Sequence, residues 1–152
     1  MAVPWEELPI GEETGHVDFI VTDQMIDDYV AALEIQHQWF TTGPSPYGGR
    51  IAPPDMLPKL GMDELFQHYL HRVMGANMRA KQAFKFFAPV RAGMRVRATG
   101  HLAEKYERRG KRFVTFEALF TDENGAPLAL DRRTQYLPVP RPEAEKTAGG
   151  TQ

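Results

Sequence analysis

The spacing of apolar side chains changes from about four residues to two near Ala76, and this change constrains the fold more than any other feature. Between residues 54 and 73 the apolar positions recur as they do on one face of a helix. Beyond Ala76 apolar and polar residues alternate, which is the pattern of strands with one buried face. A single long helix followed by antiparallel strands predicts an α+β fold, with a curved sheet wrapped around a central helix. The apolar helix positions are Leu57, Leu60, Leu65, Phe66, Tyr69, Leu70 and Val73.

Four long alternating runs follow the helix, and we expect them to form a meander. They begin near residues 78, 94, 112 and 128. The turns "ERRGK" (107–111) and "DENGA" (122–126) separate the later runs, and the second contains the Asn-Gly pair favoured in tight hairpins. The residues expected on the buried faces are Met78, Ala80, Gln82, Phe84, Phe86, Met94, Val96, Ala98, Leu102, Val114, Phe116, Ala118 and Phe120.

The first part of the chain predicts a short strand over 16–21 and a helix over 23–34. Thr22 is suited to cap that helix, because its hydroxyl accepts a hydrogen bond from an exposed N–H. A glycine- and proline-rich connection over 35–52 then leads to the central helix. Pro58 and Gly61 are expected to break or kink the first part of the central helix, and Gly75 is a candidate stop for its end. We expect one domain over 1–138 and a disordered tail over 139–152, which has few apolar side chains.

Composition excludes several classes of function. The net charge of -2 argues against nucleic acid as a partner. The chain has no cysteine, so it has no thiolate nucleophile, disulfide or cysteine-bound zinc. No run approaches the roughly 18 apolar residues of a membrane span, and the start lacks a basic region followed by an apolar one. We therefore expect a cytoplasmic protein that binds neither nucleic acid nor membrane.

Three motifs in order carry a family resemblance. They are "SPYGGRIAPP" (45–54), "QAFKFFAPVRAGMRV" (82–96) and "RFVTFEALFTDENG" (112–125). Through residues 14–137 the chain resembles the MaoC-like dehydratases, the family of the (R)-specific enoyl-CoA hydratases, and especially their divergent N-terminal-half type. The resemblance implies a single hot-dog domain that binds an acyl thioester of coenzyme A or acyl carrier protein, without a further cofactor. Active members are hydro-lyases of fatty acid metabolism that add water to, or remove it from, the double bond beside the thioester.

The chain departs from the family at the residues that carry this chemistry. Active relatives have the pattern D-x-x-N-P-x-H, for which this chain has Glu34, His37, Gln38 and Phe40 at the Asp, Asn, Pro and His places. Their connection ends in a small residue, a histidine and a glycine whose N–H faces the thioester oxygen. Here the matching residues are Ala52, Pro53 and Pro54. Proline suits the first turn of a helix but has no N–H to donate. The resemblance thus implies a degenerate subunit that depends on a catalytic partner.

The candidate site residues lie around the 35–52 connection. An alternative to the degenerate subunit is a self-sufficient hydratase in which Glu34 and His37 are the catalytic pair, since a carboxylate can orient an imidazole. The plainer interpretation is that both side chains are solvated. Aromatic residues here suit an acyl pocket, but they equally suit anchoring of the connection to the core or to another subunit. The candidate substrate-binding residues are Trp39, Phe40, Tyr47, Gly48, Gly49, Arg50 and Ile51.

Other activities and partners stay open at this stage. A hot-dog thioesterase is a third possibility, for which Asp55 and Asp63 are the candidate carboxylates. His68 and His71 share a helix face, but no third ligand is evident, so no metal is predicted. The basic turn 107–112 is either a solubilising feature or a docking point for coenzyme A phosphates or an acidic carrier. We expect a homodimer, or a heterodimer with a catalytic hot-dog subunit, formed at an exposed strand edge.

Overall fold

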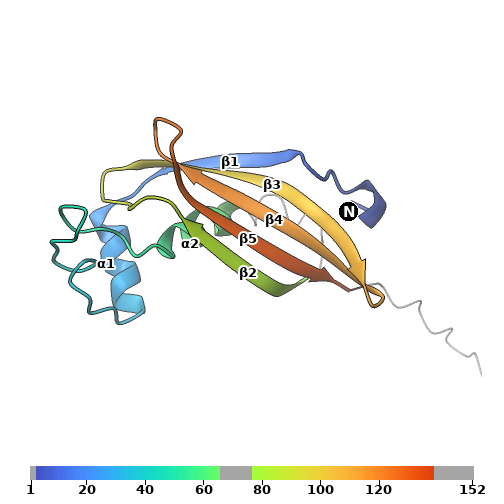
Figure 1. Cartoon of the computed structure of the whole chain (residues 1–152), viewed down its shortest axis with the longest axis horizontal. Coiled ribbons are helices and arrows are strands. Elements are labelled where there is room, and N and C mark those ends of the chain that lie inside the picture. Colours follow the sequence, from blue (N-terminus) through green and yellow to red (C-terminus); the bar gives the residue numbers. More distant parts are fainter. Residues whose placement is uncertain (1–2, 66–76, 139–152) are drawn as a thin grey trace, which may run out of the picture.

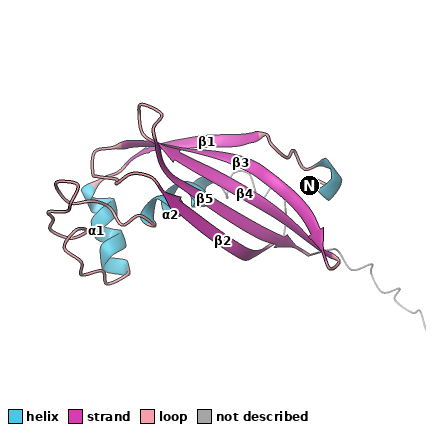
Figure 2. Ribbon diagram, viewed as in Figure 1, coloured by secondary structure: helices cyan, strands magenta, loops and turns pink. Residues whose placement is uncertain are grey.

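The structure is a computed structural model that describes residues 3–65 and 77–138. Its elements in chain order are η1 (Trp5–Glu7), β1 (Glu13–Ile20), α1 (Asp23–Ala32), α2 (Met56–Leu65), β2 (Met78–Phe86), β3 (Arg95–Arg108), β4 (Lys111–Thr121) and β5 (Pro127–Leu137). The strands form one curved sheet with α2 against one face, while α1 and the connection lie at one end (Figures 1 and 2). The predicted α+β architecture, a sheet curved around a helix, is confirmed.

The order of strands in the sheet is β1-β3-β4-β5-β2, and every neighbouring pair is antiparallel. Strands β3, β4 and β5 form the expected meander, but β2 pairs with β5 rather than with β3. The segment after β2 crosses the end of the sheet, where Phe87 N donates to Leu128 O (2.9 Å) and Gly93 N donates to Val21 O (2.7 Å). The prediction of a four-strand meander is therefore wrong, because a crossing segment and not a hairpin joins β2 to β3.

The core lies between α2 and the faces of β3 and β4. The alternation predicted for these strands is confirmed: every predicted inward residue from Val96 to Phe120 is fully buried, and only Met94, before β3, is partly exposed. Helix α2 runs through Pro58 and Gly61 without interruption, so the predicted break is wrong. Pro58 is in the first turn, where a missing N–H costs no helical hydrogen bond. At Gly61 a Cβ would lie 2.5 Å from Phe120 Cε1, so glycine permits close packing of helix on sheet.

Local signals at the ends of elements are mostly confirmed. Thr22 Oγ1 accepts a hydrogen bond from Met25 N (3.1 Å) at the start of α1, which ends at Ala32, two residues before the predicted end. The turn between β3 and β4 has two residues with positive φ, Arg109 (53°) and Gly110 (71°). The next turn is a longer loop and not a two-residue Asn-Gly hairpin, since Asp122 Oδ1 accepts from both Asn124 N and Ala126 N (2.9 Å each).

The predicted burial of one face of β2 is wrong for the chain by itself. Phe84 is 43% exposed, Phe86 46% and Met78 67%. Strand β2 is at the edge of the sheet, and alternation indicates which side chains share a face without indicating what covers it.

Several predictions fall on residues that the structure does not describe. These are the second half of the long helix (66–73), the stop at Gly75, the pair His68 and His71, and the tail 139–152. Within the two described ranges, no helix has the length and apolar character needed to cross a membrane.

Candidate functional site

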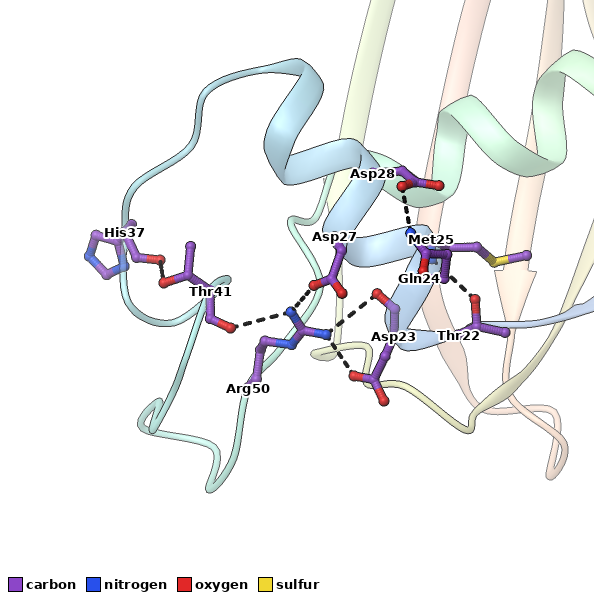
Figure 3. Close-up of polar contacts among 9 residues, drawn as sticks. All are labelled: Thr22, Asp23, Gln24, Met25, Asp27, Asp28, His37, Thr41 and Arg50. Carbon is purple, nitrogen blue, oxygen red and sulfur yellow. Dashed lines mark hydrogen bonds and ion pairs between the residues drawn. The ribbon is translucent and has the colours of Figure 1, made fainter.

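Arg50 ties the 35–52 connection to α1. Its Nη2 lies 2.6 Å from Asp23 Oδ1, and its Nη1 lies 2.5 Å from Asp27 Oδ1 and 3.3 Å from the carbonyl oxygen of Thr41 (Figure 3). The hydrogen bond to Asp27 raises the pKa of the Arg50 guanidinium, which is only 19% exposed. Two carboxylates thus already bind Arg50, and its predicted role in substrate binding stays a prediction.

A tight loop in the connection presents Tyr47. Ser45 Oγ donates to Gly49 O (2.7 Å) and accepts from Tyr47 N (3.2 Å), while Ser45 and Gly48 exchange backbone hydrogen bonds. Gly48 has a φ of 106°, a conformation that favours glycine. The loop leaves the Tyr47 side chain 51% exposed.

Glu34 and His37 occupy different surroundings. Glu34 follows α1 with a φ of 53°, and its exposed side chain lines a shallow cavity that Arg50 also lines. His37 is exposed, its Nδ1 accepts from Trp39 N (3.3 Å), and its ring lies 5.0 Å from the Trp39 ring. Within the part of the chain that the structure describes, no hydrogen bond or ion pair joins Glu34 to His37. The two side chains are therefore not joined in this structure, and their joint role in catalysis stays a prediction.

An apolar pocket of about 190 Å³ lies at the start of α2. The connection, the first turn of α2, the crossing segment and the start of β5 all line it. Ala52 N donates to Val90 O (2.7 Å), which joins two lining residues, and Pro54 forms part of the wall without an N–H to offer. The lining residues are Tyr47, Ile51, Ala52, Pro54, Leu57, Phe86, Phe87, Ala88, Pro89, Val90, Leu128 and Ala129.

The pocket brings together only two of the predicted substrate-binding residues, Tyr47 and Ile51. Trp39, Phe40, Gly48, Gly49 and Arg50 do not line it. The sequence did not single out the pocket residues of the crossing segment 87–90. The sequence feature that could have indicated these residues is the apolar run "FFAPV" (86–90), which breaks the alternation of β2.

The remaining candidates lie elsewhere. Asp55 follows Pro54 directly but faces a different cavity, and the side chain of Asp63 is outside the described part. At the basic turn, Arg112 Nε lies 3.0 Å from Glu107 Oε1 and its guanidinium lies over the Trp5 ring. This turn is at the end of the sheet opposite α1 (Figure 1), so it does not border the apolar pocket. No group of three or more potential metal ligands occurs among the described residues.

An antiparallel sheet curved around a helix is the architecture of a hot-dog domain. The sequence of residues 9–131 matches the family described as "FAS1-like, dehydratase domain region", and the chain belongs to this family. None of the curated proteins matches the sequence significantly.

Solved structures share the fold. The MaoC-like dehydratase from Rhodospirillum rubrum aligns with a TM-score of 0.74 at 14% identity, covering 90% of this chain and 98% of that one. R-hydratase PhaJ1 from Pseudomonas aeruginosa aligns with a TM-score of 0.67 at 14% identity, covering 98% and 97%. The HadBC (3R-hydroxyacyl-ACP dehydratase) complex from Mycobacterium tuberculosis aligns with a TM-score of 0.62 at 24% identity, covering 79% and 90%. These similarities show the hot-dog fold.

Proposed function

We propose that the chain is an acyl-thioester-binding subunit of the enoyl-CoA hydratase and 3-hydroxyacyl dehydratase class, and that a partner hot-dog subunit supplies the catalytic residues. The observation that carries this proposal is Pro54 in the wall of the apolar pocket. A thioester carbonyl at this helix start would meet a residue with no N–H. The pocket suits an acyl chain but lacks a donor at the place where the reaction needs one.

The chemistry of hydration explains why this loss matters. Adding water beside a thioester requires a base, an acid and donors that stabilise charge on the carbonyl oxygen. Loss of one such donor typically slows catalysis about 10²–10³-fold. In this chain Glu34 and His37 lie outside the lining of the apolar pocket, and Phe40 stands where active relatives have histidine. A chain with these features is suited to bind the substrate and to form part of its binding site.

Strand β2 is the surface that we assign to the partner. Among the described strands it has a paired neighbour, β5, on one side only, and it exposes the rings of Phe84 and Phe86, which stack with centroids 5.9 Å apart. Pairing of its free edge would satisfy backbone groups and cover these rings. The dehydratase HadBC, which shares the fold, is itself a complex. The partner is either a second copy or a catalytic hot-dog chain.

Binding of a saturated acyl-CoA, measured by calorimetry, tests the first half of the proposal. We expect saturable binding. We expect Tyr47→Ala to weaken it about fivefold to tenfold, because the variant removes an aromatic ring of which about half would cover the acyl group. Tyr106→Ala is the matched control, since Tyr106 is similarly exposed (39%) but belongs to β3, outside the pocket. Equal weakening by both variants would contradict the pocket assignment. Release of free coenzyme A thiol would indicate a thioesterase instead.

A further inference from the structure

The inner face of the sheet is apolar along β4 but polar along β5. The strand register places Asp131 beside Ala118 and Arg133 beside Phe116, so both charged residues face the side that α2 covers. Asp131 is 0% exposed and Arg133 is 4% exposed. Burial of two charges is costly even when they pair, and an apolar pair of similar size would often stabilise the fold as well or better. Their presence in this position calls for an explanation beyond stability.

A hydrogen-bonded network connects this buried pair to the exposed edge strand. Arg133 Nε donates to Asp131 Oδ2 (2.9 Å), and Arg133 Nη2 donates to the carbonyl oxygen of Pro58 in α2 (3.2 Å). Gln82 Nε2, on β2, donates to Asp131 Oδ1 (3.1 Å). Arg79 Nη1 then donates to Gln82 Oε1 (3.1 Å). The network therefore anchors the side-chain amide of Gln82, which accepts one hydrogen bond from the exposed Arg79 side chain.

A cavity of about 310 Å³ borders this network. Three cationic side chains and one carboxylate line it, which gives the lining an excess of positive charge. The carboxylate is Asp55. Burial of Tyr29, together with the hydrogen bond that Tyr29 makes to Asp55, raises the pKa of the Tyr29 hydroxyl to about 12. The Tyr29 hydroxyl is protonated near neutral pH, as tyrosine ordinarily is, and donates to Asp55. The lining residues are Tyr29, Asp55, Pro58, Lys59, Arg79, Gln82, Phe84 and Arg133.

This polar cavity is separate from the apolar pocket. The two have no lining residue in common. Pro54 and Asp55, adjacent in the chain, line different cavities at the start of α2, and the stacked rings of Phe86 and Phe84 do the same on β2. The polar cavity is therefore not explained by binding of an acyl chain in the apolar pocket.

We propose that the polar cavity binds a small organic carboxylate. Its oxygens would accept hydrogen bonds from Arg79 and Lys59, whose side chains reach the cavity from β2 and α2. Its alkyl body would lie against Phe84 and Pro58, the apolar part of the lining. The buried network holds Gln82, the hydrogen-bond partner of Arg79, so part of the order that ligand binding requires is already present. This inference does not depend on the proposed activity toward thioesters, although the cavity shares Phe84 with the surface of β2 that we assign to the partner.

Nuclear magnetic resonance titration of the whole chain with butyrate tests this proposal. The side-chain amide of Gln82 is the reporter, and sodium chloride keeps the ionic strength constant. We expect saturable shifts with butyrate and at least roughly tenfold weaker binding of butyramide, which has the same shape without charge. Inorganic phosphate is the comparison without an alkyl body. If phosphate binds as tightly as butyrate, the assignment of an organic carboxylate is wrong.

Variants of exposed cations complete the test without disturbing the buried pair. We expect Arg79→Gln and Lys59→Gln each to weaken butyrate binding about tenfold. Lys81→Gln is the matched control, because Lys81 is also an exposed cation of β2 but lines a different cavity, with Glu104 and Thr115. The proposal is wrong if butyrate does not saturate, if butyramide binds equally well, or if Lys81→Gln weakens binding as much as Arg79→Gln.

Discussion

At the scale of single residues, Asp131 shows how burial competes with pairing. Burial raises the pKa of its carboxyl group, and the opposing effects of Arg133 and Gln82 do not cancel the increase. The folded state therefore holds a proton on Asp131 at pH values where the unfolded chain has released it. Between the ordinary pKa of 3.8 and the raised one, the folded chain binds more protons than the unfolded chain.

The Asp131→Asn variant tests this direction. The contribution of Asp131 to the free energy of unfolding should be fully present below its unfolded pKa and should decrease as pH rises through the raised folded pKa. Urea unfolding of both proteins from about pH 3.5 to about pH 7 measures this difference, since other carboxylates contribute equally to both. The stability of the native chain relative to Asp131→Asn should be greatest at the acid end. A difference that stays constant, or that grows with pH, would show that the folded pKa is not raised.

At the scale of elements, the alternation of residues in β3 and β4 predicts the buried face because α2 covers that face. The same alternation in β2 identified residues that share a side, but within the described ranges no element fully covers Phe84 and Phe86. Periodicity is a property of one segment, whereas burial depends on two. The sequence indicated Tyr47 and Ile51 as site residues but missed Val90. Val90 reaches the pocket only because the crossing segment passes the start of α2, and the pattern of one segment does not indicate such a contact.

The close contact between α2 and the sheet predicts the effect of Gly61→Ala. A methyl group there would lie 2.5 Å from Phe120 Cε1 and 2.8 Å from Ala98 Cβ, so the helix has to move. We expect a loss of about 1–3 kcal/mol in the free energy of unfolding, despite the better helix propensity of alanine. Gly49→Ala is the control, since it meets nothing within 4 Å, and it should change stability by less than about 0.5 kcal/mol. Urea unfolding of the two variants compares them directly, and an unchanged Gly61→Ala would contradict the packing.

The connection predicts a local effect of Arg50→Met. Loss of the pairs with Asp23 and Asp27 should release residues 38–51 from α1, so their amides should exchange hydrogen faster while those of β3 and β4 do not. Arg97→Met is the matched control, because Arg97 pairs with Asp18 on the sheet, away from the connection. Mass-spectrometric hydrogen exchange distinguishes the two. Equal protection of the connection in Arg50→Met and the native chain would show that this ion-pair cluster does not hold it.

At the scale of the whole molecule, the edge strand β2 is the surface by which we expect the chain to meet other chains, because it is partly apolar and pairs only with β5 among the described residues. We predict that Phe84→Asp weakens association with the partner, whether a second copy or a catalytic chain, by at least roughly tenfold, because it places a charge in the interface. Tyr106→Asp introduces the same charge at a similarly exposed ring on β3 and should leave association unchanged. Analytical ultracentrifugation measures both. Undiminished association of Phe84→Asp would mean that β2 is not the interface.

The measurement that tests the central claim most directly is the rate of trans-enoyl-CoA hydration by the purified chain alone, followed as loss of the conjugated double bond. We expect no rate above that of buffer, and a rate that rises when a hot-dog subunit with an intact D-x-x-N-P-x-H pattern is added. The rate should stop rising when the two chains are present in equal amounts. Robust hydration by the chain alone, abolished by Glu34→Gln, would contradict the claim that its own pocket lacks the catalytic groups.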